Sequence, residues 1–388
     1  MLAAAALGTS VPGSRAVGRP LGPVWSGSWE AAPSGAAAVG AGVAIRNVVH
    51  LSVGGASLRI RLSNRLGTAP LRLGAVTVAL RRTGPDAVPG TLRRATFLGT
   101  PTTTVPPGRD LLTDPVRLPV PAGADLLVTV FVPTDCGPAT DHGTALQTSY
   151  LARNGAGHAA DVNGVAYTAT TRHWYYVTGV DVHGTALGSV VAFGDSLTDG
   201  TGSTPDTNHR WPDRLADRLR ARRIGVLNAG IGGNRLLRDD VGPSALARLD
   251  ADALNRAGAR VLIVWEGIND IIRGTAETPV ADDFAAAYRT LVTRAHAAGL
   301  RVVGVTLTPY GGHPAHTPAR EALRQRVNTL IRYGAIFDAV ADADAAVRDP
   351  ADPRRIRPAY DPGDHLHFDD AGMLAVARVV ADALTGSR

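Results

Sequence analysis

The chain has 388 residues, of which 45% are hydrophobic and 19% are charged, a balance typical of a folded globular protein rather than a disordered one. This length exceeds the usual size of a domain with a single hydrophobic core, so two domains are expected. The formal net charge is +6, but the 40 basic residues, all arginine, are spread along the chain. Because no dense basic run is interleaved with aromatics, the sequence argues against nucleic-acid binding.

The first residues, Met1–Gly8, resemble the end of a signal-peptide hydrophobic region followed by small residues, without the basic segment that precedes such a region. We interpret residues 1–22 as a signal-like segment truncated by a misplaced start codon or as a disordered extension rich in Ala and Gly. The first interpretation predicts a secreted, extracellular protein. No run of about 18 apolar residues occurs in the chain, so stable membrane insertion is not expected.

From about Trp25 to Val182 the hydrophobic pattern has period two, in short runs broken by Gly and Pro. The clearest runs cover residues 58–62, 73–80 and 126–132. The Gly-Gly pair within Val53–Ala56, between two such runs, is a hairpin signal. Many short strands without a convincing helix predict that residues 23–183 form an all-β sandwich or jelly-roll domain.

The pattern changes at Ser189, where apolar strands begin to alternate with amphipathic helices. This alternation predicts that residues 189–388 form an α/β domain with a parallel sheet and helices on both faces, after a short linker. Ligands of such sheets bind at the carboxyl ends of the strands. We expect strands at residues 190–193, 225–228, 261–265, 302–307 and 336–339, and helices near residues 211–222, 244–257, 281–298, 320–332 and 370–384.

Four short polar motifs lie at predicted strand ends or just before the last helix. They are Gly194-Asp195-Ser196-Leu197, Asn228-Ala229-Gly230-Ile231-Gly232-Gly233-Asn234, Gly267-Ile268-Asn269-Asp270 and Asp364-His365-Leu366-His367. Each motif alone is weak evidence, since a Gly-Asp-Ser tripeptide occurs by chance in many chains. In this order, and at these places in a βαβ pattern, the four together indicate a single site.

This combination resembles the SGNH hydrolases, also called the GDSL esterase/lipase family, over roughly residues 189–384. The resemblance implies a flavodoxin-like three-layer αβα fold with Ser196 as the nucleophile. It also implies that the N–H of Gly233 and the side-chain amide of Asn269 belong to the oxyanion hole, and that Asp364 and His367 supply the acid and the base.

The chemistry of these side chains agrees with the roles that the resemblance implies. A serine hydroxyl needs an adjacent base, and His367 would take the proton of Ser196. Asp364, three residues earlier, would hold the other ring nitrogen of that histidine. The oxyanion that develops on a substrate needs fixed donors, for which Ser196 N–H, Gly233 N–H and the Asn269 amide form a set.

The last motif allows other interpretations. His365, which stands where the family usually has glycine, competes with His367 as the base, but the spacing from Asp364 favours His367. The two histidines and their flanking Asp364 and Asp369 also resemble a metal site. The acid and base roles explain them better, so we expect neither a metal nor a cofactor. The single cysteine, Cys136, excludes an intramolecular disulfide.

The five tryptophans have open roles. Trp25, Trp29 and Trp174 would form a sugar-binding platform on the β domain, or would pack in its core or at an interface, which we favour. Trp211 and Trp265 are near the motifs in sequence, which is compatible with a place beside the site. A role in the hydrophobic core is equally compatible with their positions.

Together these features predict a serine esterase that hydrolyses carboxylic esters, with short acyl groups, through an acyl-enzyme. A carbohydrate O-deacetylase is an alternative, since a β-sandwich before an SGNH domain resembles the arrangement of some carbohydrate esterases. A lipase or phospholipase is another, although 5% aromatic residues and the lack of a long amphipathic lid disfavour long-chain lipids. A catalytically inactive binding protein is the alternative from a different class. The expected partner is a small-molecule or polysaccharide ester.

Overall fold

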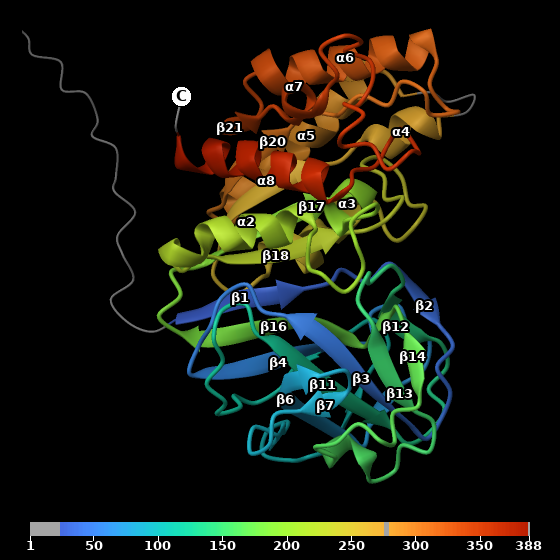
Figure 1. Cartoon of the computed structure of the whole chain (residues 1–388), viewed down its shortest axis with the longest axis vertical. Helices are drawn as coiled ribbons and strands as arrows, with labels where there is room; N and C mark the ends of the chain where they lie inside the picture. Colours follow the sequence, from blue (N-terminus) through green and yellow to red (C-terminus); the bar gives the residue numbers. More distant parts are fainter. Residues whose placement is uncertain (1–23, 275–278, 387–388) are drawn as a thin grey trace, which may run out of the picture.

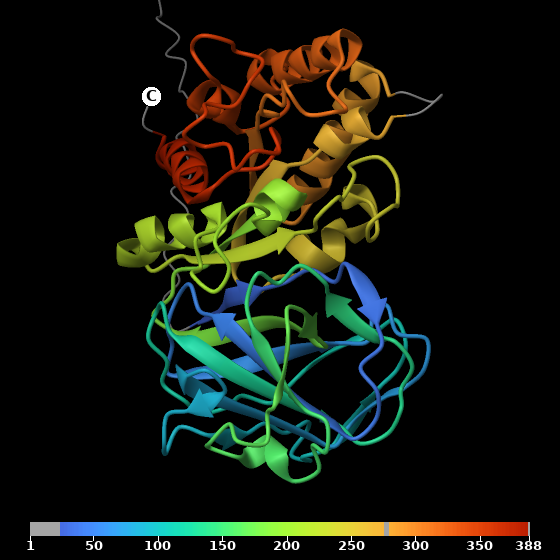
Figure 2. The same ribbon diagram turned by 45° about the vertical axis from the view of Figure 1, so that its right-hand side comes forward.

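The computed structural model describes residues 24–274 and 279–386, and they form two domains stacked on one another (Figures 1 and 2). The extension predicted for residues 1–22 lies outside the described residues. The regular elements of the N-terminal domain are strands and one short 3₁₀ turn, and the C-terminal domain alternates strands and helices. Among the described residues, no helix combines the length and the apolar character needed to cross a lipid bilayer.

The N-terminal domain is a β-sandwich built mainly from two antiparallel sheets. One sheet has the order β1-β16-β4-β10, and the other has the order β14-β13-β3-β11-β6-β7, with β8 also paired to β6. The strands are β1 Val24–Glu30, β2 Gly35–Ala37, β3 Val43–His50, β4 Ser57–Ser63, β5 Leu71–Leu73, β6 Ala75–Thr83, β7 Asp86–Ala87, β8 Arg93–Arg94, β9 Thr103–Val105, β10 Asp110–Leu112, β11 Asp125–Val132, β12 Ala139–His142, β13 Ser149–Ala152, β14 Ala169–Thr171, β15 Trp174–Tyr175 and β16 Val177–Gly184, with one 3₁₀ turn, η1 His158–Ala160.

Period-two alternation places the core of the sandwich between its two sheets. Leu58, Ile60 and Leu62 of β4 point into the same buried cluster as Val128 and Val130 of β11. The hairpin predicted at residues 53–56 is wrong, because the flanking strands β3 and β4 belong to different sheets. The two glycines there instead let the chain pass close to the backbone of another segment, with which Gly55 forms an isolated bridge at Val120.

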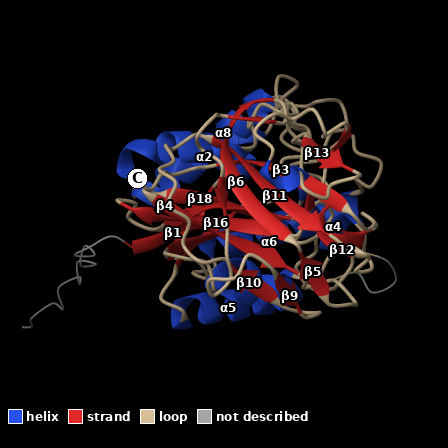
Figure 3. Cartoon of the chain, turned by 90° about the horizontal axis from the view of Figure 1, so that it is seen from below, coloured by secondary structure: helices blue, strands red, loops and turns tan. Residues whose placement is uncertain are grey.

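The C-terminal domain has a five-stranded sheet of order β18-β17-β19-β20-β21, in which every neighbouring pair is parallel. Helices α2 and α8 pack together on one face of this sheet, and α5 and α6 on the other (Figures 1 and 3). The strands are β17 Ser189–Gly194, β18 Gly225–Gly230, β19 Ala259–Trp265, β20 Arg301–Val305 and β21 Ala339–Ala341. The helices are α1 Ser196–Asp199, α2 Trp211–Leu219, η2 Arg220–Arg222, α3 Ala245–Leu249, η3 Asp250–Leu254, α4 Ile268–Ile272, α5 Ala281–Ala297, α6 Pro318–Tyr333, α7 Ala343–Val347 and α8 Asp370–Thr385.

The last strand and three short helices differ from the sequence expectation. The strand expected at residues 336–339 lies later, in β21, because Ile336 is buried in the core from the preceding turn and Phe337 packs over Gly304 of β20. The helices α1, α4 and α7 have only four or five residues, which is too short to show helical periodicity in the sequence.

The two domains share a tightly packed interface in which β1 runs beside β18, the edge strand of the parallel sheet (Figure 1). An isolated parallel bridge joins Ala31 to Asn228. A Cβ atom on Gly27 of β1 would come within 2.6 Å of the side chain of Leu227, so this contact requires glycine. The β domain therefore covers an edge that would otherwise expose unpaired backbone groups.

Buried contacts between polar side chains link the two domains at this interface. Glu30 of β1 contacts the Arg256 guanidinium at 2.6 Å, and Arg65, just after β4, pairs with Asp252 of η3. Burial raises the pKa of Glu30 to about 8, against the opposing charge of Arg256. The two domains are thus joined by polar contacts that water does not reach, and breaking one partner of such a pair is costly.

Candidate active site

The four motifs meet at the carboxyl ends of the parallel strands. Gly194 ends β17 and Ser196 opens the short helix α1, while the second and third motifs follow the ends of β18 and β19. Parallel strands bring these ends to one edge of the sheet. A cavity of about 480 Å³ opens there, and it is lined by Thr144, Ser196, Thr201, Gly232, Gly233, Asn269, Ile272, Arg273, His313, Ala315, Leu366 and His367.

A hydrogen-bonded chain links three of the predicted residues. Nε2 of His367 lies 2.9 Å from Oγ of Ser196, and Nδ1 of His367 lies 2.6 Å from Oδ2 of Asp364. The other oxygen of Asp364 accepts the backbone N–H groups of His367 and Leu366 at 2.9 and 3.0 Å. The carboxylate therefore fixes both the ring and the backbone of His367.

Asp364 keeps its negative charge in this setting. Partial burial alone would raise its pKa, but the hydrogen bonds from the backbone and ring of His367 and from Leu366 lower the pKa of Asp364 below its usual value. An ionised carboxylate at this position holds a proton on Nδ1 of His367 and leaves Nε2 to accept one from Ser196.

Asp369 holds the start of helix α8, which follows the last motif. Its side chain accepts the N–H groups of Ala371 and Gly372 at 3.0 and 2.9 Å and so caps helix α8. His367, two residues earlier, is thereby held in a short segment between its carboxylate partner and a capped helix.

The three predicted oxyanion donors surround the same cavity. Within the described residues, neither Ser196 N–H nor Gly233 N–H donates to a protein acceptor. The Asn269 amide donates one hydrogen to the carbonyl of Asn234 at 2.9 Å, which leaves its second hydrogen for another acceptor. Gly233 has a left-handed φ of 78°, which favours glycine, and a Cβ there would lie 2.8 Å from the terminal nitrogen of the flexible Arg273 side chain.

Two buried aspartates within the motifs brace the loops. Asp195 accepts the N–H of Leu197 at 2.9 Å and caps α1, which orients Ser196. Asp270 accepts the N–H groups of Leu236 and Leu237 at 2.8 and 3.1 Å, and so ties the third motif to the segment after the second. Burial raises the pKa of both aspartates.

Arg248 of α3 lies beneath the candidate site, and no sequence pattern indicated it. Its buried guanidinium donates to the carbonyl of Gly194 at 2.9 Å, to the carbonyl of Ala229 at 2.7 Å and to the side chain of Asn234 at 2.9 Å. It also pairs with Glu266 at 3.1 Å. One arginine therefore holds the ends of β17 and β18 together beneath the site.

The second histidine of the last motif has a different partner. Nδ1 of His365 lies 2.6 Å from Oδ2 of Asp361, whose other oxygen accepts the N–H groups of Gly363 and His365. His365 has a left-handed φ of 62°, a conformation that explains why glycine suits this position. The geometry thus places His367, not His365, against Ser196.

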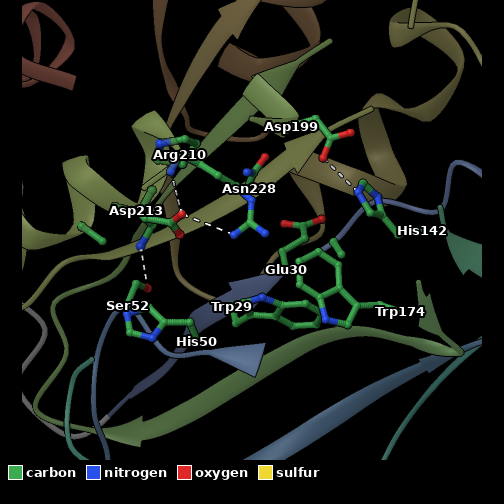
Figure 4. A pocket seen from close by; sticks show the side chains of 14 residues that line it. Trp29, Glu30, His50, Ser52, His142, Trp174, Asp199, Arg210, Asp213 and Asn228 are labelled. Carbon is green, nitrogen blue, oxygen red and sulfur yellow. Dashed lines mark hydrogen bonds and ion pairs between the residues drawn. The ribbon is translucent and has the colours of Figure 1, made fainter. Parts of the chain in front are cut away.

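Four of the five tryptophans pack inside the protein, and Trp25 is partly exposed. Trp211 and Trp265 are buried in the core of the C-terminal domain, where Trp265 also stacks on Phe368. Trp29 and Trp174 are buried in edge-to-face contact beside a small interdomain cavity, as Figure 4 shows. The sugar-platform hypothesis is therefore wrong for Trp29 and Trp174, which do not reach solvent as a platform would.

Comparison with known proteins finds a family similarity within the C-terminal domain. Residues 192–375 match the model of the GDSL-like lipase/acylhydrolase family. No curated protein sequence matches the chain.

The solved structures found by comparison match about half of this chain. An acetyl xylan esterase is 21% identical with a TM-score of 0.40, covering 50% of this chain and 99% of its own. A psychrotrophic esterase from Pseudoalteromonas is 18% identical with a TM-score of 0.39, covering 51% and 97%. A GDSL-like lipase from Bacteroides thetaiotaomicron is 17% identical with a TM-score of 0.39, covering 52% and 89%.

Proposed function

We propose, on the premise that residues 192–375 form a domain of the GDSL-like lipase/acylhydrolase family, that the chain is a serine esterase acting on short-acyl carboxylic esters. The observation that carries this proposal is the unbroken hydrogen-bonded chain from Ser196 through His367 to Asp364, with distances of 2.9 and 2.6 Å. A nucleophile, a base and an orienting carboxylate in this geometry are suited to acyl transfer.

In the proposed mechanism, His367 takes the proton of Ser196 as its oxygen attacks the ester carbonyl. The oxyanion of the tetrahedral intermediate accepts hydrogen bonds from Ser196 N–H, Gly233 N–H and the Asn269 amide. The imidazolium, stabilised by Asp364, then protonates the leaving alcohol, which gives an acyl-enzyme. Water attacks this acyl-enzyme with His367 again as the base, and the acid is released as Ser196 recovers its proton.

The lining of the cavity supports a small acyl group and a polar alcohol. Ile272, Ala315 and Leu366 supply apolar surface, while Thr144 and Arg273 supply polar groups. A volume of about 480 Å³ lies within the usual range of pockets for small molecules. The mixed lining also favours a second candidate, a carbohydrate O-deacetylase, since a polar rim suits a hydroxylated leaving group better than a lipid.

The experiment that tests the proposal is hydrolysis of p-nitrophenyl acetate by wild type and Ser196→Ala. We expect the variant to lose this activity while keeping the wild-type melting temperature, and retained activity would refute the role of Ser196. His367→Asn and His365→Asn form a matched pair, of which only the first should abolish turnover.

Two further comparisons separate the alternatives. A series of p-nitrophenyl esters of increasing acyl length, with a panel of acetylated sugars, distinguishes a short-acyl esterase, a deacetylase and a lipase. Reaction with a serine-directed fluorophosphonate separates all of these enzymes from an inactive binding protein, which would not be labelled.

A further inference from the structure

The β domain reaches the candidate active site at the end of strand β12. His142 ends this strand, and two residues later Thr144 lines the cavity beside Ser196. The loop that carries them is fastened to the C-terminal domain, since Ala145 O accepts from the Arg210 guanidinium and the Asp206 carboxylate accepts from the chain near Thr148. The β domain therefore contributes directly to the walls of the site.

His142 makes a buried contact with Asp199, the last residue of α1. Its Nε2 lies 2.9 Å from Oδ1 of Asp199, and its Nδ1 lies 2.8 Å from the carbonyl oxygen of Ala32 (Figure 4 shows the first contact). Both side chains are only 4% exposed. A carbonyl and a carboxylate accept hydrogen bonds, so this arrangement favours the doubly protonated, positively charged imidazole.

The charge on His142 agrees with its surroundings. Burial lowers the pKa of His142, but the negative charge of Asp199 and the hydrogen bonds to Asp199 and Ala32 outweigh burial and raise it. The ring also packs against Trp174, with ring centroids 5.5 Å apart. The ring is therefore held on three sides.

The second oxygen of Asp199 holds the oxyanion loop. Its Oδ2 accepts the N–H of Gly232 at 3.0 Å, and Gly232 immediately precedes Gly233. The two segments are in close contact, because a Cβ on Gly230 would lie 2.2 Å from the backbone nitrogen of Asp199. One carboxylate thus joins the helix that begins with Ser196 to the loop that presents Gly233.

We propose that His142 of the β domain is a positioning residue for ester hydrolysis, because it fixes Asp199 and thereby the spacing between Ser196 and the Gly232–Gly233 loop. This inference rests on the proposed function. An oxyanion donor stabilises the negative charge that develops in the transition state. A displaced donor therefore reduces transition-state stabilisation more than it reduces substrate binding. Displacements of about 1 Å at such sites cost about 100-fold in rate.

The test compares kcat and KM for p-nitrophenyl acetate in full-length variants. We expect His142→Ala to lower kcat by about 10- to 100-fold with KM within about threefold of wild type. His142→Gln retains a donor for Asp199 and should recover most of the loss. The inhibition constant of a trifluoromethyl ketone, which forms a tetrahedral adduct, should rise in parallel with the fall in kcat.

His173→Gln is the matched control. His173 forms a similar pair with Asp141, the neighbour of His142 on β12, at 2.5 Å, but that pair has no contact with Asp199 among the hydrogen bonds of the described residues. We expect its kcat and KM to stay within twofold of wild type. An equal loss in both histidine variants would indicate a general effect on the domain and would overturn the proposal.

Asp199→Asn decides the matter if His142→Ala fails to fold. Gly232 and His142 face different oxygens of Asp199, and asparagine puts an NH₂ group in place of one of them. One of the two contacts is therefore lost, and kcat should again fall by about 10- to 100-fold. If the wild type is active and both folded variants keep the wild-type kcat, the inference is refuted while the esterase proposal stands. If the wild type neither hydrolyses esters nor reacts with a fluorophosphonate, the proposed function fails and the inference fails with it.

Discussion

Replacing Asp364 with asparagine should disable the base while leaving the substrate cavity intact. The single amide oxygen of asparagine would be taken by the backbone N–H groups that Asp364 now accepts, from His367 and Leu366. The amide NH₂ would then face Nδ1 of His367, which must become an acceptor. That change puts the ring proton on Nε2, where it prevents His367 from accepting the proton of Ser196.

The size of the loss follows from the exposure of this carboxylate. In triads with a buried aspartate the same substitution lowers kcat by about 10⁴-fold. The Asp364 side chain is 47% exposed, so water offsets part of the lost charge. We therefore expect a loss in kcat of about 100- to 1000-fold, or about 3 to 4 kcal/mol in the activation barrier. KM should change less than threefold, because Asp364 does not line the cavity.

Steady-state hydrolysis of p-nitrophenyl acetate measures both constants, and Asp361→Asn provides a matched control. Asp361 holds His365 at the same 2.6 Å distance but does not reach Ser196, so its variant should keep kcat within about threefold. A loss below tenfold for Asp364→Asn, or equal losses in the two variants, would refute the reasoning.

Three further changes test other parts of the account. Asn269→Ala should lower kcat about 100- to 1000-fold with little change in KM, in the same assay, and an unchanged kcat would remove Asn269 from the oxyanion hole. Gly233→Ala should lower both kcat and the melting temperature, since the left-handed φ of 78° disfavours a side chain and a Cβ would meet Arg273. Burial raises the pKa of Glu30 from 4.5 to about 8, so the folded state binds a proton that the unfolded state releases, and the stability of wild type should fall as the pH rises from 4.5 to 8. This carboxyl contributes at most about 5 kcal/mol to that fall, and urea unfolding of Glu30→Gln at pH 5 and 8.5 should show a smaller decrease than wild type, whereas equal decreases would contradict the assignment.

The site residues that could be predicted from the sequence are those whose position in space follows from the local sequence around them. Parallel strands deliver their carboxyl ends to one edge, so a motif at a strand end is already placed in the site once the βαβ alternation is recognised. Ser196 and Asn269 could be placed on this basis. Asp364 and His367 could be paired because His367 comes three positions after Asp364 and one tight turn joins them.

The unpredicted part depends on contacts between segments far apart in the sequence. His142 and Asp199 are 57 residues apart, and Arg248 lies 54 residues from Gly194, whose carbonyl it holds. No local periodicity marks such partners. The loop at Val53–Ala56 carried a hairpin signal, yet its strands joined different sheets because the sandwich core, rather than the turn, decided their pairing. A single histidine or arginine in a strand or helix gives no sign of which domain it will contact.

The central claim is that Ser196, activated by His367, is the nucleophile of this protein. Mass spectrometry of the intact protein after reaction with a fluorophosphonate, followed by peptide mapping, tests it most directly. The account predicts one adduct, located on Ser196, that is absent in Ser196→Ala and forms far more slowly in His367→Asn. An unmodified wild-type protein, or an adduct on another residue, would contradict the account.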